Sequence, residues 1–135
     1  MVRWLYITLE GGIPVRVGEV CLLTENVERL SAFYIRLLGL GDAGNDPVHR
    51  TLMAGETVLT VYREPGYRAC GGQSIVLAFT VADVDAAYSQ LLERNAVVLE
   101  PPTDRPWGAR NLCVLDADGN RVYLRSYPTQ EKREG

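Results

Sequence analysis

The sequence predicts an α+β fold made of two tandem βαβββ modules. The first observation is an internal repeat: the segment that begins at Val20 has a counterpart 57 positions later, beginning at Leu77. In both copies an apolar strand is followed by a small polar residue and then by an amphipathic helix. The second observation is that each half ends in a hairpin whose last strand, 58–62 or 121–125, has the same alternating pattern. A repeated pattern of this length indicates a repeated structural unit.

The first repeat contains the elements expected of one such module. A short strand is predicted at Glu19–Leu23, and Asn26 is suited to cap the helix that follows it. Apolar residues then recur at helical spacing as far as Leu38. Two further strands, 48–53 and 57–62, complete the module as a hairpin.

The second repeat follows the same order. A strand is predicted at Ser74–Val81, and Asp83 is suited to cap the second helix. The remaining predicted elements are a short strand at 97–100, a loop at Pro101–Gly108, and a hairpin of strands 111–115 and 121–125.

The chain length of 135 residues is typical of one domain. We expect a single domain over residues 18–127, with modules at 18–63 and 74–127 and a hinge at 64–73. Residues 1–17 are expected to form an N-terminal extension with a possible extra strand, and residues 128–135 a C-terminal tail.

The composition indicates which kinds of binding partner and which cellular compartment to expect for this protein. The net charge is −3 and the basic residues are scattered, which argues against nucleic acid as a partner. No apolar run approaches membrane-spanning length. The three cysteines are an odd number without a CxxC motif, so we expect a reduced, cytoplasmic protein.

Alternation along the strands divides the predicted sheet into two faces. One face, called here the helix face, is apolar throughout and is expected to lie under the helices: Val20, Leu22, Leu59, Val61, Leu77, Phe79, Val81, Val122 and Leu124. The other, called the open face, is mixed: Glu19, Cys21, Thr60, Tyr62, Val76, Ala78, Thr80, Arg121, Tyr123 and Arg125. The open face is too polar for a dry core and unusually aromatic for plain surface. It therefore predicts a ligand cleft or a wet dimer groove, and an ordinary solvated sheet face is the alternative.

Four segments carry a resemblance to a known family: Val27-Glu-Arg-Leu-Ser-Ala-Phe-Tyr-Ile-Arg-Leu-Leu-Gly-Leu40, Phe79-Thr-Val-Ala-Asp-Val-Asp85, Pro106-Trp-Gly-Ala-Arg110 and Leu115-Asp-Ala-Asp-Gly-Asn120. With them the chain resembles the vicinal oxygen chelate superfamily, which includes glyoxalase I, extradiol dioxygenases, fosfomycin-resistance proteins and bleomycin-binding proteins. The resemblance covers roughly residues 18–127. The expected architecture is a curved mixed sheet with a cleft, and with the helices on its outer face. Because one fold hosts many chemistries, the resemblance indicates the fold more strongly than the function.

The resemblance also places four metal-ligand positions, at Glu19, Thr60, Val76 and Tyr123. Metal-dependent members carry His or Glu at these positions, whereas here only Glu19 supplies a suitable donor. The single histidine, His49, lies on a different predicted strand. We therefore expect no metal and no cofactor.

The residues left for binding an organic molecule are aromatic, charged or apolar. Trp107 and the tyrosines could stack on a planar or cationic group, and Glu19 could meet an amine. The structural alternatives are that Trp107 fills a sheet edge or a subunit contact, and that Glu19 pairs with a nearby arginine. The predicted ligand-binding residues are Glu19, Thr60, Tyr62, Val76, Trp107, Arg110, Arg121 and Tyr123.

The sequence contains no recognisable nucleophilic triad, GxSxG, Walker A or GxGxxG motif, so no catalytic residues are assigned. The first hypothesis is a metal-independent small-molecule binding protein that resembles the bleomycin-resistance branch, with a possible role in antibiotic resistance. The resemblance implies a homodimer with clefts shared between chains. A metal-dependent lyase, isomerase or dioxygenase is the second hypothesis, and a non-catalytic interaction module with a self-filled cleft is the third.

Overall fold

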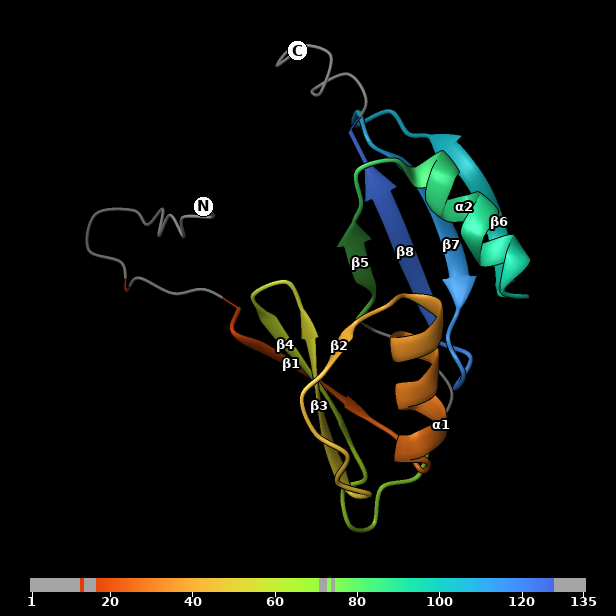
Figure 1. The fold of residues 1–135 in the computed structure, drawn as a ribbon. Helices are drawn as coiled ribbons and strands as arrows, with labels where there is room; N and C mark the ends of the chain where they lie inside the picture. The colour runs from red at the N-terminus through yellow and green to blue at the C-terminus, as the bar shows by residue number, and fades with distance from the viewer. Residues whose placement is uncertain (1–12, 14–16, 71–72, 74, 128–135) are drawn as a thin grey trace.

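The chain folds into two βαβββ modules, seen in the computed structural model at the bottom and the top of Figure 1. The described residues are 13, 17–70, 73 and 75–127, and the strand predicted in the N-terminal extension and the tail at 128–135 lie outside them. The first module contains β1 (Glu19–Leu23), α1 (Val27–Ala32), the π-helical segment η1 (Phe33–Leu37), β2 (Gly41–Asp42), β3 (His49–Ala54) and β4 (Thr57–Tyr62). The second contains β5 (Leu77–Thr80), α2 (Val84–Glu93), β6 (Val97–Asp104), β7 (Arg110–Leu115) and β8 (Arg121–Ser126). The predicted α+β class and the module order are confirmed.

Each module forms its own four-stranded mixed sheet, with matching strand orders β1-β4-β3-β2 and β5-β8-β7-β6. The first strand of each module runs parallel to the last, and the remaining neighbours are antiparallel. This shared topology is the structural form of the repeat in the sequence.

Both predicted helix caps are formed. Asn26 Oδ1 accepts a hydrogen bond from the Arg29 N–H at 3.0 Å, and Asp83 Oδ1 accepts from the N–H groups of Asp85 and Ala86. The first helix differs from the prediction in its last turns, which are π-helical. It ends at Leu37 with Leu38 as its C-cap, and the next residue, Gly39, has a φ of +75°, which favours glycine.

The largest differences from the predicted strands are at β5, β6 and β2. β5 begins only at Leu77, so Val76 lies just outside the strand. The loop predicted at Pro101–Gly108 is wrong in its first part, because β6 continues to Asp104. β6 is an edge strand with two shifts of register, and proline is tolerated at such positions because no inner ladder bond is lost. The two-residue strand β2 was not predicted.

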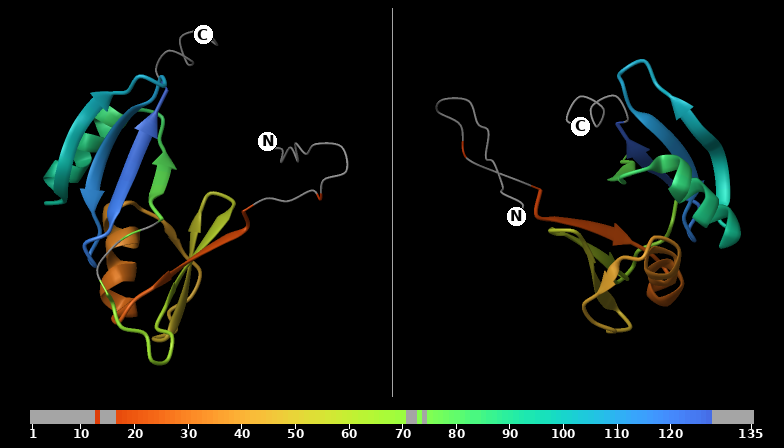
Figure 2. Two further views of the ribbon diagram at one scale, coloured as in Figure 1. Left: turned by 180° about the vertical axis from the view of Figure 1, so that it is seen from behind. Right: turned by 45° about the horizontal axis from the view of Figure 1, so that its top comes forward.

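One buried cluster joins the two modules. It combines side chains of α1 and η1 with those of β7 and β8, among them Leu30, Tyr34, Leu112 and Val122. The Tyr34 hydroxyl donates a 2.8 Å hydrogen bond to Asp116 in the β7–β8 turn. Figures 1 and 2 show the α1 helix beside this end of the second sheet.

The helices cover the helix face only in part. Leu59, Val61, Val122 and Leu124 are buried as predicted, but Val20, Leu22, Leu77, Phe79 and Val81 are only partly buried. The prediction that all nine side chains lie under the helices is therefore wrong for the edge strands β1 and β5.

No helix in the described part of the chain combines the length and the hydrophobicity needed to cross a membrane.

Candidate functional site

The open face of the first sheet brings Glu19 and Thr60 together. The Thr60 hydroxyl donates a 2.9 Å hydrogen bond to Glu19 Oε2, and Thr60 itself is buried. Glu19 thus has a threonine partner rather than the arginine partner considered as an alternative. Tyr62 lies on the same strand and packs against His49, with ring centroids 5.5 Å apart. This sheet thus offers one carboxylate near Thr60 and an aromatic pair at the other end of the β1–β4 ladder.

The open face of the second sheet is centred on Tyr123. In the strand register Glu100 pairs with Cys113, Cys113 with Tyr123, and Tyr123 with Ala78, which gives one row across the sheet. Burial, together with the nearby Cys113 and Glu100, raises the pKa of the Tyr123 phenol. Burial likewise raises the pKa of the Cys113 thiol, so the thiol stays protonated and unreactive.

Arg105, which the sequence analysis did not single out, stabilises this row through contacts with two side chains. Arg105 donates to Asn111 Oδ1 at 2.8 Å and forms an ion pair with Glu100 at 3.2 Å. Arg105 was missed because Pro101–Gly108 was assigned to a loop, and Glu100 and Asn111, although placed on strands, were not recognised as its partners. The alternation of β7 was the available signal, since it places Asn111 on the same face as Cys113.

Arg121 and Val76 lie at the β5–β8 edge of this sheet. Leu77 pairs with Val122, so Val76 comes next to Arg121, and Val76 is 37% exposed. The side-chain amide of Gln73 bonds both backbone groups of Arg121, at 2.8 and 3.0 Å. These contacts fix the backbone from which the Arg121 side chain extends.

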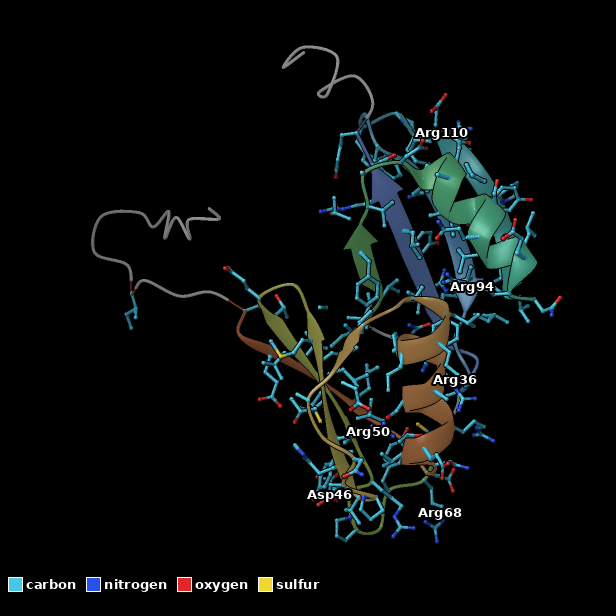
Figure 3. All side chains as sticks on the ribbon, viewed as in Figure 1. Arg36, Asp46, Arg50, Arg68, Arg94 and Arg110 are labelled. Carbon is cyan, nitrogen blue, oxygen red and sulfur yellow. The ribbon has the colours of Figure 1, made fainter. Side chains whose placement is uncertain are left out.

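Arg110 is not on the open face, and its predicted place in the cleft is wrong. It follows the alternation of Leu112 and Val114 on β7, and both of these belong to the core beneath α2. Its guanidinium forms two 2.9 Å hydrogen bonds with Asp85 and one of 3.2 Å with Asp104 (Figure 3). The resemblance carried by the segment Pro106–Arg110 suggested a place for Arg110 near the cleft. In the structure, Asp85 in the first turn of α2 holds the Arg110 side chain on the other side of the sheet.

The Arg110–Asp85 pair leads to a pH-dependent prediction. Hydrogen bonds from Arg110 lower the pKa of Asp85. A carboxylate with a lowered folded-state pKa contributes stability above its unfolded pKa, about 3.9, and loses it as the pH falls further. We expect Arg110→Gln to reduce stability slightly at pH 7 and to differ less from the wild type below about pH 4. Urea denaturation of the wild type and of Arg110→Gln, at pH 7 and below about pH 4, measures the difference in their free energies of unfolding. An equal difference under the two conditions would contradict the prediction.

Trp107 lies at the tip of the β6–β7 hairpin and is 68% exposed. The turn that carries it is closed by two backbone hydrogen bonds, Arg105 N–H to Ala109 C=O at 2.8 Å and Gly108 N–H to Arg105 C=O at 3.1 Å. Gly108 has a φ of +96°, which favours glycine. The indole is therefore held on an ordered turn and left uncovered by the described part of its own chain.

A cavity of about 650 Å³ lies on the opposite side of the sheets, between the two modules. It is lined mainly by residues of the helix face, by the end of η1 and by α2, together with the β3–β4 turn and with Ala78 and Thr80 of β5. None of the eight predicted ligand-binding residues lines it. Of the predicted site residues, Glu19, Thr60 and Tyr62 share the open face of the first sheet, and Arg121 and Tyr123 that of the second, whereas Arg110 and Trp107 lie outside both groups.

A family model described as the glyoxalase/bleomycin resistance protein/dioxygenase superfamily matches residues 16–124. The chain belongs to this superfamily. The sequence expectation of a vicinal oxygen chelate fold is thereby confirmed.

The chain is also similar to two curated proteins named for anthracycline biosynthesis. It is 32% identical over 129 residues to the anthracycline biosynthesis protein DauV of Streptomyces sp. (strain C5), covering 86% of this chain and 44% of that protein. It is 30% identical over 142 residues to the anthracycline biosynthesis protein DnrV of Streptomyces peucetius, covering 98% of this chain and 48% of that protein. The chain thus spans about half the length of these curated relatives.

A solved superfamily structure supports the same fold. The glyoxalase/bleomycin resistance protein/dioxygenase family enzyme from Burkholderia phytofirmans PsJN matches with a TM-score of 0.74 and 18% identity. The match covers 84% of this chain and 99% of that one. At this identity the likeness is evidence for the fold alone.

The four positions at which metal-dependent superfamily members hold an ion do not provide a metal site in this chain. Glu19 supplies one carboxylate, and the Thr60 hydroxyl beside it is a weak metal donor. Val76 has no donor atom, and the raised pKa of Tyr123 favours the neutral phenol, which is a poor ligand. Within the described residues, no three His, Cys, Asp or Glu side chains lie close enough together to hold an ion. The donor set does not fit a superfamily metal.

Proposed function

We propose that this protein binds a planar, aromatic small molecule on its open faces without using a metal ion. The observation that carries the proposal is the chemistry of the four superfamily positions, which offer one carboxylate, a hydroxyl, an apolar side chain and a phenol. These groups suit an organic ligand better than a divalent cation. Aromatic faces would supply the contact area, and Glu19 and Arg121 would orient polar substituents.

The two curated relatives indicate the class of ligand. Both take part in anthracycline biosynthesis, and anthracyclines are flat, fused-ring aromatic molecules. A flat ring system matches the groups available here, since Trp107, Tyr123 and Tyr62 all carry aromatic faces. Each stacking contact contributes about 0.5–1.5 kcal/mol beyond the area that it buries. A role in antibiotic resistance would follow if the captured molecule is toxic.

A second copy of the chain is proposed to complete the site. Within the described residues, β1 pairs only with β4 and β5 only with β8, so one edge of each strand is unpaired. Exposed edges of this kind invite a partner strand, and the apolar Ile75 and Val76 stand exposed beside β5. Two copies would provide four modules. The curated relatives are about twice as long as this chain, which is consistent with four modules in one chain.

Trp107 provides the sharpest test of the ligand class. We expect the full chain to bind daunorubicin, an anthracycline whose own fluorescence reports binding, and Trp107→Ala to weaken that binding about tenfold through lost stacking. Because Trp107 is 68% exposed, the substitution leaves the fold intact. Leu92→Ala is the matched control, since Leu92 is an exposed apolar residue on α2, away from the open faces.

Unchanged affinity in Trp107→Ala would contradict the proposed stacking role. Failure of the wild-type chain to bind daunorubicin would contradict the anthracycline class. In that case an open face covered by a second chain, with no space left for a ligand, would favour the interaction-module hypothesis.

A metal-dependent enzyme is the second candidate, and one observation favours it: Glu19 retains a carboxylate at one of the four superfamily positions. Metal analysis of untagged protein separates the two functions. A stoichiometric zinc, nickel, manganese or iron that is lost in Glu19→Gln would support the enzyme.

A further inference from the structure

The cavity between the modules is larger than a packing defect. Its volume is about 650 Å³, whereas protein interiors contain few voids larger than one water molecule. Small-molecule sites have volumes of roughly 300–1,000 Å³. The cavity is therefore large enough for an organic ligand.

The wall of this cavity is the part of the helix face that the helices leave uncovered. Val20 on β1, and Leu77 and Phe79 on β5, line it and are only partly buried. The opposite wall is formed by Leu37–Leu40 after η1 and by Ala87 and Leu91 of α2. Apolar side chains that face unfilled space lose their dispersion contacts, so an apolar occupant would be stabilised there.

One charged side chain, Arg94, lines the cavity within the described residues. Its Nη1 donates a 3.0 Å hydrogen bond to the carbonyl oxygen of Leu37, which holds the guanidinium between the end of α2 and the end of η1 (Figure 3). None of the ion pairs formed among the described residues involves Arg94. The guanidinium has further N–H donors for an anion, and Gln90 lies one helical turn away on the same wall.

We infer that this cavity is a second small-molecule site, which takes an apolar aromatic molecule bearing one anionic group. The apolar walls would hold the ring system, and Arg94 would bind a carboxylate, sulfonate or similar oxyanion. The site is formed within one chain and includes none of the eight predicted ligand-binding residues, although Ala78 and Thr80 of β5 contribute to its lining. It therefore does not depend on a second copy or on the proposed anthracycline ligand.

Two dyes that differ by a charged group test both halves of this inference. 1-Anilinonaphthalene-8-sulfonate carries a sulfonate, whereas N-phenyl-1-naphthylamine is the same ring system without it. We expect both dyes to bind the full-length folded chain with increased fluorescence. Arg94→Gln should weaken the sulfonate dye about tenfold, as expected for one charge-assisted hydrogen bond, and leave the neutral dye unchanged. Arg36→Gln is the matched control, because Arg36 is an exposed arginine on η1 that does not line the cavity.

A substitution that fills the cavity tests its location. Ala87→Phe places a ring into the space and should weaken both dyes about tenfold or more, whereas Ala86→Phe, one residue earlier on the exposed side of α2, should weaken neither. Retention of both affinities in folded Ala87→Phe would overturn the inference, as would the absence of dye binding to the wild type. If Ala87→Phe does not fold, equal loss of both dyes or of neither in Arg94→Gln would overturn the anionic part. Trp107→Ala should leave both dyes unchanged, which separates this site from the proposed anthracycline site.

Discussion

Asp116→Ala is expected to lower the free energy of unfolding by about 3 kcal/mol, because it leaves several polar groups without partners. The buried carboxylate accepts four hydrogen bonds: from the Tyr34 hydroxyl at 2.8 Å, from the Asp118 N–H at 2.9 Å, and from the backbone and side-chain N–H groups of Asn120 at 2.8 and 3.0 Å. Alanine removes all four. The effect should be large because this one side chain both shapes the β7–β8 turn and ties it to the first module.

Urea denaturation measures this loss, with two variants for comparison. Asp46→Ala removes an exposed aspartate that accepts two backbone N–H groups before β3, so its effect should be much smaller. Tyr34→Phe deletes one of the four donors and should cost about 1 kcal/mol. Equal losses in Asp116→Ala and Asp46→Ala would show that the contact between the modules adds no stability.

Leu30→Ala is expected to lower the free energy of unfolding by about 3 kcal/mol, since replacement of a buried leucine by alanine typically costs 2–5 kcal/mol. Leu30 is 0% exposed and lies on α1, in the cluster where α1 meets residues of both sheets. Loss of its side chain would leave a void at the centre of the molecule. Leu92→Ala removes the same atoms from a position on α2 that is 50% exposed, and should cost much less.

The same denaturation series separates the outcomes for these two leucines. If Leu30→Ala and Leu92→Ala lose similar stability, the cluster on α1 does not join the modules as described. If Leu30→Ala alone is strongly destabilised and both modules still unfold in one transition, the shared core is supported.

Local signals in the sequence were sufficient to predict the repeated βαβββ module. Asn26 and Asp83 predicted where the helices begin, and alternation along β4 and β8 predicted which side chains face the core. Pro101 and Pro102 led to the wrong prediction for β6. A proline pair indicates a loop unless the strand is known to lie at an edge, and that depends on the order of strands in the sheet.

The candidate site was predictable to a smaller extent, because it depends on contacts between distant segments. Alternation placed Glu19 and Thr60 on one face, and the 2.9 Å hydrogen bond between them agrees with it. Arg110 was misplaced because its partner Asp85 is 25 residues away and on a helix. The cavity beside Arg94 could not be predicted, since it results from how far the two modules lie apart.

The hydroxyl of Thr60 donates a hydrogen bond to one oxygen of the Glu19 carboxylate, and the ion pair between Arg105 and Glu100 orders the other open face. We propose that these two half-sites act together only when a second copy supplies the missing half. The curated relatives, about twice as long, are the natural place to look for the same arrangement within one chain.

Titration of untagged, full-length protein with daunorubicin, before and after exhaustive treatment with EDTA, shows whether ligand binding needs a metal ion. We expect the same affinity in both samples and no stoichiometric transition metal by elemental analysis. Binding that disappears on chelation and returns on addition of zinc, nickel, manganese or iron would contradict this expectation.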